Sequence, residues 1–544
     1  MNKEQAAALL QSLAERVRTD AATGAITVEI SLSEKRALEH GASWLAGEDP
    51  VTPSPAPAPF PLDLASTTLK EPENPEILLC LDFGTAMSKA FARRLTDDKL
   101  LPLAIGQRAG QADPIFGLIS SVYVSPDGRL LFGQDAVSAS HDGRAANLRR
   151  IDSFKDMLAK GDPGREIGQA FLDAKTNPTS VKLQEIDVLT LYLAYLTDMA
   201  VTELAERQGV SRYVSRRFTL PVFDRERSTW AKRQLRDVLA RAQVLADTFH
   251  GRWKTGIPAA EAKAAVTAAR QANVAPVLVE RDGVTEPIAA IGSRVHGVAN
   301  SAGTRQLFAV VDVGAGTIDF ALFYRVPHEG KPDRFFLIPG TEKVLRQAGN
   351  QVDNELAAFI LQRAGVRSSD QDFARIESAL ALDVRRLKEA LFRGDGILTY
   401  ELVNDREVQI TRLEFLQSDG IGRLEQQIHR KFEEMIASAH ESWFTGTALV
   451  DPVALITGGG ADLPFVRSLG GKQMTRGRPL SIRLGTPRPP YIQTEYPELA
   501  DEYPRLAVAL GGSSGNLPEL APQQFTELGA SQVDHHLETV PKGI

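Results

Sequence analysis

The sequence is poor in the residues that support disulfides, metal clusters and nucleic-acid binding. Cys80 is the single cysteine among 544 residues, which excludes an internal disulfide and a cysteine zinc site. The nine histidines do not follow the H-E-x-x-H spacing or a similar ligand pattern. The net charge of −7 gives no electrostatic support for coating nucleic acid, so we expect no nucleic-acid partner. A single cysteine fits a reducing setting, and we expect a cytoplasmic protein.

Long uninterrupted apolar runs are also missing. The most apolar helical stretch, 188–201, contains Thr190, Thr197 and Asp198 and is shorter than the roughly 20 residues that a membrane span needs. At the N-terminus, no apolar signal core precedes the polar stretch 15–18. We therefore expect neither a membrane span nor a signal peptide.

The composition changes along the chain and predicts five parts. Residues 1–48 are expected to form a small N-terminal α+β module, and 49–75 a proline-rich linker, with a docking peptide for a proline-recognising domain as the alternative. Strands and helices alternate over 76–300 and 301–515, which predicts α/β architecture in two halves. Residues 516–544 are polar and lack apolar periodicity, so we expect a flexible tail.

Helical periodicity is clearest in five segments of the α/β part. The pattern predicts helices over 186–207, 224–247, 351–364, 373–392 and 412–442.

Two short segments far apart in the sequence are nearly copies of each other. Segments 82–90 and 312–320 each follow an apolar run and consist of an aspartate, a glycine turn and a returning apolar run. A strand, an acidic residue, a tight glycine turn and a second strand form a loop whose backbone N–H groups can face an anion. One such loop is a weak signal, but two, each opening half of the α/β part, predict a duplicated nucleotide site.

The residues of these loops suit phosphate and magnesium chemistry. Asp82, Asp312 and Asp319 are carboxylates of the kind that hold a hydrated Mg²⁺, which keeps several waters and takes few protein ligands. Glycines at 84, 314 and 316 permit backbone donation to phosphates, and the hydroxyls of Thr85 and Thr317 can add contacts.

A third glycine loop follows in the second half. Segment 454–466 consists of an apolar strand, three glycines and a helix start, with Asp462 near the first helical turn. Its glycines would let a base or ribose lie against the main chain. A purely structural turn is the alternative, but the position after two phosphate loops favours the ligand site.

The order of these loops resembles the actin, hexokinase and heat-shock chaperone superfamily, and in detail the ATPase domain of heat shock protein 70 (DnaK-type). Further segments resemble landmarks of that family in the same order: 119–124 with 127–136, 153–158, 218–223, 285–290, 349–354 and 503–512. The resemblance implies a two-lobed actin-like ATPase fold made of duplicated ribonuclease-H-like domains, lobe I over 76–300 and lobe II over 301–515. It also implies ATP or ADP and Mg²⁺ as ligands.

The resemblance assigns roles to individual residues. Asp82 and Asp312 would orient the waters of Mg²⁺, and Glu286 would hold a further metal water. Lys155 would stabilise the γ-phosphate and the attacking water. For Lys155 and Glu286 the alternative is a solvated surface charge.

The resemblance also implies the nucleotide contacts. Thr317 and Asp319 would lie near the γ-phosphate, whereas Asp353 is expected to cap a helix. The remaining contacts implied are Gly84, Thr85, Ala86, Gly314, Ala315, Gly316, Gly349, Lys388, Gly458, Gly459, Gly460 and Asp462.

The base end departs from the family pattern. The family segment that clamps adenine reads E-x-x-K-R, whereas this chain has Arg385, Lys388 and Glu389, and Asp462 replaces an arginine of the third loop. Stacking of an arginine on a base contributes roughly 0.5–2 kcal/mol, so adenine binding is expected to be weaker by about ten-fold or more. A second departure is that only a short polar tail follows the segment 503–512, too short for a peptide-binding domain.

The sequence therefore predicts a DnaK-like ATPase that uses slow hydrolysis of Mg-ATP as a conformational switch acting on a partner protein, through residues 1–48. The alternatives are a nucleotide-binding scaffold without turnover, an actin-like filament former, and a small-molecule kinase of the same superfamily.

Overall fold

The computed structural model is a mixed α/β structure. It describes residues 60–107, 113–142, 148–295, 305–327, 332–446 and 451–525, together with short pieces between residues 12 and 30. The chain divides into two units, Met1–Phe60 and Pro61–Ile544. In the first unit, β1 (Arg18–Thr19) pairs antiparallel with β2 (Ile26–Thr27). Of the module predicted for 1–48, the structure describes only short pieces, and the linker up to residue 59 lies outside the described residues.

The second unit contains two large sheets. The first consists of β3 (Asn74–Asp82), β4 (Met87–Arg94), β5 (Lys99–Pro102), β6 (Gly117–Ile119), β9 (Val214–Leu220) and β11 (Val284–Thr285). The second consists of β12 (Gln306–Val313), β13 (Ile318–Val326), β14 (Arg334–Leu337), β15 (Lys343–Leu345), β18 (Val453–Thr457), β21 (Arg483–Leu484) and β22 (Glu519–Leu520).

The two sheets repeat the same strand order. In the first, β3 pairs antiparallel with β4 and parallel with β9, and the path continues to β5 on one side and β11 on the other. In the second, β12 pairs antiparallel with β13 and parallel with β18, and the path continues to β14 and β21. The central strands are buried, as expected of sheets covered on both faces. The hairpins β3–β4 and β12–β13 are therefore equivalent elements of two similar sheets.

Smaller elements complete the unit. The strands outside the two sheets are β7 (Val122–Val124), β8 (Arg129–Phe132), β10 (Ile257–Pro258), β16 (Ile397–Glu401), β17 (Glu407–Thr411), β19 (Gln473–Thr475) and β20 (Pro479–Ser481). The helices are α3 (Gly133–Asp142), α4 (Asp156–Lys160), α5 (Glu185–Gln208), α6 (Arg225–Thr248), α7 (Ala259–Gln271), α8 (Glu286–Gly292), α9 (Gly349–Arg363), α10 (Phe373–Arg393), α11 (Arg412–Leu416), α12 (Asp419–Ser438), α13 (Ser442–Thr445), α14 (Pro464–Arg467), α15 (Pro490–Glu495) and α16 (Tyr503–Gly512).

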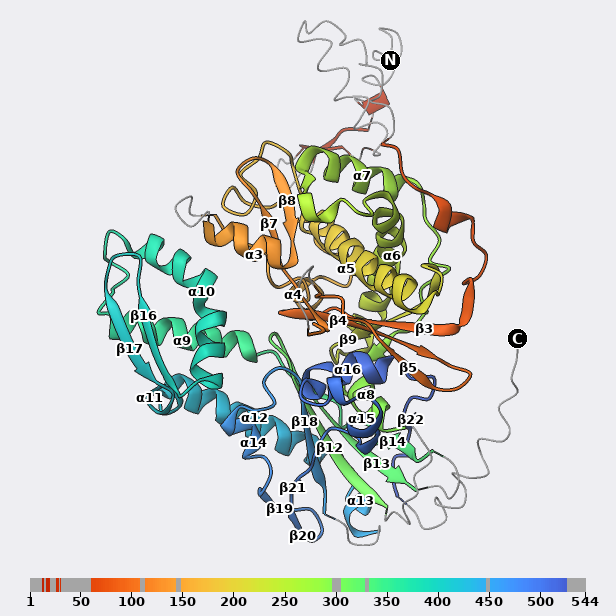
Figure 1. The fold of residues 1–544 in the computed structure, drawn as a ribbon, viewed down its shortest axis with the longest axis vertical. Helices are drawn as coiled ribbons and strands as arrows, with labels where there is room; N and C mark the ends of the chain where they lie inside the picture. The colour runs from red at the N-terminus through yellow and green to blue at the C-terminus, as the bar shows by residue number, and fades with distance from the viewer. Residues whose placement is uncertain are drawn as a thin grey trace, which may run out of the picture. The chain divides into compact units, whose positions relative to one another are not determined.

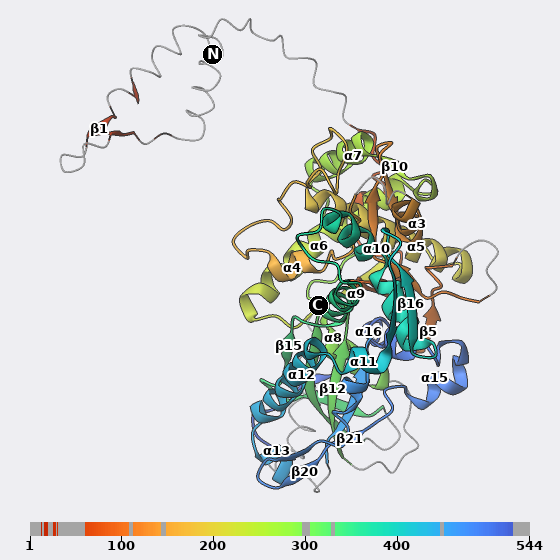
Figure 2. The same cartoon turned by 90° about the vertical axis from the view of Figure 1, so that its left-hand side faces the viewer.

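Helices α8 and α16 lie between the two sheets (Figure 1). They cross closely because small residues line their contact. A Cβ atom at Gly511 would lie only 1.8 Å from the carbonyl oxygen of Ala289, so this crossing has no room for a side chain. Helices α9 and α10 and the hairpin β16–β17 form a group at one side of the second sheet and face the viewer in Figure 2.

Four of the five predicted helices correspond to single helices, α5, α6, α9 and α10. The prediction of one helix over 412–442 is wrong. Helix α11 starts at a capping box between Thr411 and Glu414, and a second helix begins after Ser418, so the segment bends between them.

Within the part of the chain that the structure describes, α5 is long and apolar enough to cross a membrane, which the sequence reading of 188–201 did not anticipate. However, 72% of its most apolar window is buried inside the unit. A helix that is apolar all round and enclosed by protein is the usual core helix of a large domain.

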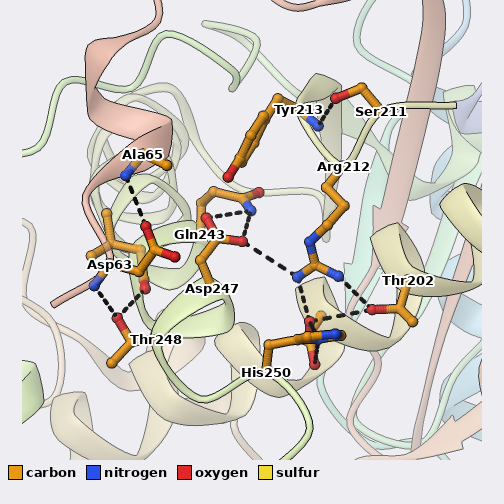
Figure 3. Close-up of polar contacts among 12 residues, drawn as sticks. Asp63, Ala65, Thr202, Ser211, Arg212, Tyr213, Gln243, Asp247, Thr248 and His250 are labelled. Carbon is orange, nitrogen blue, oxygen red and sulfur yellow. Dashed lines mark hydrogen bonds and ion pairs between the residues drawn. The ribbon is translucent and has the colours of Figure 1, made fainter.

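A polar cluster around Arg212 joins the second half of α5 to the end of α6, through Thr202 and Asp247 (Figure 3). Asp198 accepts hydrogen bonds from Arg212 at 2.5 Å and from the indole of Trp253 at 2.9 Å, and it contacts His250 at 2.9 Å. The last residue of α6 contacts the predicted linker, because the N–H of Asp63 donates to the hydroxyl of Thr248. Part of the predicted linker is thus packed against the first half of the unit.

The predicted tail also differs from expectation at its start. Strand β22 extends the second sheet by pairing with β14, and the ring of Phe525 packs against Trp443 and Tyr324. These residues are ordered parts of the second half, and the tail beyond 525 lies outside the described residues.

Candidate functional site

A cleft of about 590 Å³ opens among the loops that follow β3, β12 and β18. Helices α8, α9, α10 and α16 complete its walls. Among the predicted site residues, the following line it: Asp82, Gly84, Thr85, Ala86, Lys155, Glu286, Asp312, Gly314, Ala315, Gly316, Thr317, Gly349, Lys388, Gly458, Gly459, Gly460 and Asp462.

The first two glycine loops approach each other closely. A Cβ atom at Gly316 would lie 2.7 Å from the hydroxyl oxygen of Thr85, in the opposite loop. Within the first loop, a Cβ at Gly84 would lie 2.2 Å from the carbonyl oxygen of Met87. Glycine is therefore required in the first case by the facing loop and in the second by the tightness of the turn.

Asp82 and Asp312 end the equivalent strands β3 and β12, and both are held by a threonine. Thr219, in β9, donates its hydroxyl to Asp82 Oδ1 at 2.8 Å. Thr457, in β18, donates to Asp312 Oδ1 at 2.8 Å. Sequence reasoning missed both threonines as positioning groups. The available signal was that each lies at or next to the end of a strand, within two residues of a proline or glycine.

Lys155 and Glu286 form a buried ion pair in the cleft, so the reading of both as solvated surface charges is wrong. The ammonium of Lys155 also lies 3.7 Å from Asp82 Oδ1. Burial alone would lower the pKa of Lys155, but the charges of Glu286 and Asp82 raise it above its usual value. Lys155 therefore stays protonated at neutral pH and provides a fixed positive charge.

Sequence reasoning missed a second lysine in the cleft. Lys89, in β4, lies opposite Asp82 in the strand register, with its Nζ 3.3 Å from Asp82 Oδ2. Burial alone would raise the pKa of Asp82, but Lys89, Lys155 and the Thr219 hydroxyl together hold it below its usual value. The signal in the sequence was a lysine near the start of the returning strand, close to the glycine turn.

Asp312 has a different electrostatic environment from Asp82. Burial, together with repulsion from Glu286, raises the pKa of Asp312 to about 7. Near neutral pH the two equivalent aspartates therefore differ in charge. Two positively charged lysines contact Asp82, whereas the donor to Asp312 is the uncharged hydroxyl of Thr457.

Asp319, expected beside the γ-phosphate, does not line the cleft. Its side chain is fully buried, and Oδ1 accepts a hydrogen bond of 2.7 Å from the backbone N–H of Val222. Burial and repulsion from Glu286 raise its pKa well above the usual value. Asp319 therefore ties hairpin β12–β13 to the segment after β9, a structural contact between the two halves.

The donor set fits a hydrated magnesium ion better than a directly bound one. Within the described ranges, no group of three or more His, Cys, Asp or Glu side chains is arranged to hold a metal ion. Asp82 is engaged by Thr219 and Lys89, and Glu286 by Lys155. Magnesium usually takes one or two carboxylates and keeps waters and phosphate oxygens. Asp312, with no lysine in its hydrogen-bonding contacts, is best placed to hold such a hydrated ion.

The third loop presents bare main chain to the cleft. Gly458 has a φ of +87°, in the left-handed region that favours glycine. A Cβ at Gly460 would lie 2.5 Å from Val313 Cγ1, whereas a Cβ at Gly459 would meet no atom within 4 Å. The open space at Gly459 leaves room for a flat group against the backbone.

The end of the cleft formed by α10 is strongly charged. Lys388 binds Asp353 at 2.8 Å and donates to the carbonyl of Gly349, and Arg385 lies 3.9 Å from the same aspartate. Asp353 lies inside α9 and does not cap it, so the prediction of a cap is wrong. Glu389, expected at the base end, lines the cleft here, and further lining residues were not anticipated: Phe392, Arg393, Arg412, Leu463, Pro464 and Arg505.

Comparison with known proteins gives no family assignment: no protein-family model matches the chain, and no curated protein is significantly similar to it.

Proposed function

We propose that this protein binds Mg-ATP in the cleft between two actin-like lobes and hydrolyses it slowly, as a DnaK-like switch acting on a partner protein. The observation that carries the proposal is the convergence of Asp82 and Asp312 on one cleft. Each ends the first strand of a sheet with the same strand order, and each is followed by a glycine loop. A duplicated hairpin that faces its copy is the arrangement expected if both halves grip the same phosphates.

The fold supports the actin-like part of this proposal. Both large sheets have a central strand with an antiparallel neighbour on one side and a parallel neighbour on the other. This repetition agrees with the duplicated ribonuclease-H-like domains that the resemblance implies. It does not depend on the identity of the ligand.

The chemistry of the cleft suits phosphoryl transfer to water. In this reaction water attacks the γ-phosphorus of ATP, the bond to the bridging oxygen breaks, and ADP and phosphate leave. The protein's main task is to position the groups and stabilise their charge. The backbone N–H groups of the two glycine loops would bind the phosphates, and Lys155 would stabilise the charge on the transferred group. Magnesium, when bound, would shield the phosphate oxygens.

Glu286 and the two aspartates would act on water and metal. Glu286 holds the Lys155 ammonium and fixes its position in the cleft. Asp312, with a pKa of about 7, is ionised in part of the molecules at neutral pH, and in that form it would accept hydrogen bonds from the waters of a bound magnesium ion. Asp82, kept ionised by its lysines, would bind water on the other side.

The proposed conformational switch is inferred from the fact that elements of both halves line the cleft. The lining comes from β3, β4 and α8 on one side and from β12, α9 and α10 on the other. A ligand that contacts both halves favours the closed arrangement by its difference in affinity for the open and closed states. Hydrolysis removes part of those contacts and thereby returns the protein to the open state.

The test is release of phosphate from ATP by the full chain, with and without Mg²⁺. We expect Lys155→Met to abolish release, whereas Lys160→Met should not change it because Lys160 is an exposed residue of the same short segment. Equal turnover in the wild type and Lys155→Met would contradict the proposal.

A nucleotide-binding scaffold without turnover is the second candidate. It is favoured by the contacts of Lys155 with both Glu286 and Asp82, which the ammonium must loosen before it can serve the γ-phosphate. Binding of Mg-ATP with no release of phosphate would support this candidate, and measurable release would exclude it.

A further inference from the structure

Tyr192 is a fully buried residue of α5 that does not line the cleft but contacts two segments that do. Its ring stacks on that of Phe154, with the ring centroids 4.6 Å apart and an interplanar angle of 9°. Phe154 directly precedes Lys155 in the sequence. Two buried rings in such close contact have little freedom to move, so Tyr192 limits where the Lys155 backbone can lie.

The hydroxyl of Tyr192 holds the first glycine hairpin. Its oxygen lies 2.7 Å from Ser88 Oγ and 3.0 Å from Ser120 Oγ, and the two serine oxygens are 3.0 Å apart. Each of the three hydroxyls can donate to the next, which closes a ring of hydrogen bonds. Ser88 directly precedes Lys89 in β4. The backbone N–H of Ser120 donates to the carbonyl of Ala86, in the glycine loop itself, at 3.0 Å.

This hydroxyl ring resists displacement because all of it is buried. Ser88 and Ser120, like Tyr192, have no exposed surface. Burial raises the pKa of Tyr192 to about 12, so its hydroxyl keeps its proton at neutral pH. A buried hydroxyl that loses its partners costs free energy, so the ring opposes any shift of the hairpin relative to α5.

The second hairpin shows that the hairpin fold does not itself require such a network. By strand register, Ser88 and Ile318 occupy equivalent positions, each one residue before the partner of the aspartate that ends the preceding strand. Ile318 is apolar and buried. The same place is thus filled by an alkyl side chain in one half and by a hydroxyl ring in the half that carries Lys155.

We propose that Tyr192 is a positioning residue that holds Lys155 and the first glycine loop in a fixed relation to each other. This inference rests on the proposed function, because it takes phosphate release from ATP as the reaction. Binding of the phosphates needs the loop, whereas turnover also needs Lys155 at the correct distance from the transferred group. Loosening the contacts of Tyr192 therefore lowers kcat more than it changes KM.

The experiment measures phosphate release and calorimetric Mg-ATP binding by the full chain carrying Tyr192→Phe. The substitution removes one oxygen and keeps both the ring stack and the hydrogen bond between Ser88 and Ser120, and urea unfolding checks that the variant is folded. We expect kcat to fall by about three- to ten-fold, the range that one buried hydrogen bond accounts for. Binding should stay at one Mg-ATP per chain, with KM within about two-fold of the wild type.

Two further variants complete the design. Tyr195→Phe removes a hydroxyl one turn further along α5, beside Gly133, and should keep the wild-type kcat. Phe154→Leu removes the ring on the other side of the stack and should lower kcat with little change in KM. If Tyr192→Phe does not fold, Phe154→Leu decides by the same measurements.

The outcomes separate this inference from the function on which it rests. Wild-type kcat in Tyr192→Phe, or an equal loss of binding and turnover, overturns the positioning role of Tyr192 alone. A wild type that binds no Mg-ATP or releases no phosphate overturns the proposed function and this inference with it.

Discussion

Asp82 and Asp312 occupy equivalent ends of two similar sheets, and each accepts a hydrogen bond of 2.8 Å from a threonine of the neighbouring parallel strand. The repetition includes the strand order, the acidic residue, its hydroxyl donor and the glycine turn that follows. The two copies differ in charge, because Lys89 and Lys155 contact Asp82, whereas burial and Glu286 raise the pKa of Asp312. The cleft is therefore duplicated in shape and asymmetric in electrostatics.

The threonines are expected to position their aspartates for the ligand. Thr219→Val and Thr457→Val each remove a hydrogen bond to a carboxylate, which contributes about 1.5–3 kcal/mol. We expect each to weaken Mg-ATP binding by about ten-fold or more in a calorimetric titration. Thr267→Val, on the exposed face of α7, is the control and should bind as the wild type. Wild-type affinity in both site variants would show that the hydroxyls do not position the carboxylates.

The pKa of Asp312 predicts how stability depends on pH. Because the folded-state pKa of about 7 lies above that of an unfolded aspartate, binding of a proton stabilises the nucleotide-free protein. This contribution is complete below about pH 4 and is lost as pH rises to about 7. Mg-ATP binding should change in the opposite direction and strengthen as Asp312 ionises.

The measurement is denaturant unfolding of the nucleotide-free protein between about pH 5.5 and pH 8. As pH rises over this range, the free energy of unfolding should fall less in Asp312→Asn than in the wild type. An identical pH dependence for both proteins would mean that Asp312 does not titrate there.

The Lys155–Glu286 pair is expected to matter for stability as well as for turnover. Lys155→Met leaves the buried Glu286 without its cation, which typically costs about 3 kcal/mol. The double variant Lys155→Met with Glu286→Gln removes both charges and should recover most of that loss in urea unfolding, while phosphate release stays absent. Failure of the second change to restore stability would show that the two groups are not energetically coupled.

The cluster around Asp198 is expected to be structural. Asp198→Ala leaves Arg212 and the indole of Trp253 without their shared acceptor, and we expect a loss of about 3 kcal/mol in the free energy of unfolding. Asp162→Ala, at an exposed aspartate, is the control. The affinity for Mg-ATP should be unchanged in both variants, and a selective loss of affinity in Asp198→Ala would indicate coupling to the cleft.

The sequence predicted the glycine loops well because their signals are local. Each loop consists of an apolar strand, an aspartate, a glycine turn and a returning strand within a few residues. The local order of residues is therefore enough to predict the hairpin. Because the loops are duplicated, the sequence also predicted that they share one site. The residues from Asp82 to Asp462 that were expected there line one cleft, with the exception of Asp319.

What the sequence could not provide depends on contacts between distant segments. Lys89 was missed because its importance arises from the register with Asp82 across the hairpin. Asp319 was misplaced because the N–H that binds it belongs to Val222, in the other half. The start of the predicted tail packs on the second sheet through Phe525, a single aromatic residue with no periodic pattern around it.

The most direct test of the central claim is a calorimetric titration of Mg-ATP into the wild type, Asp82→Asn and Asp312→Asn. We predict one binding site per chain in the wild type, with binding at least about ten-fold weaker in each variant because both loops hold the same phosphates. At 100 times the dissociation constant, the ligand should also stabilise the wild type by about 2.7 kcal/mol. No binding by the wild type at millimolar Mg-ATP, or full affinity in either variant, would contradict the account.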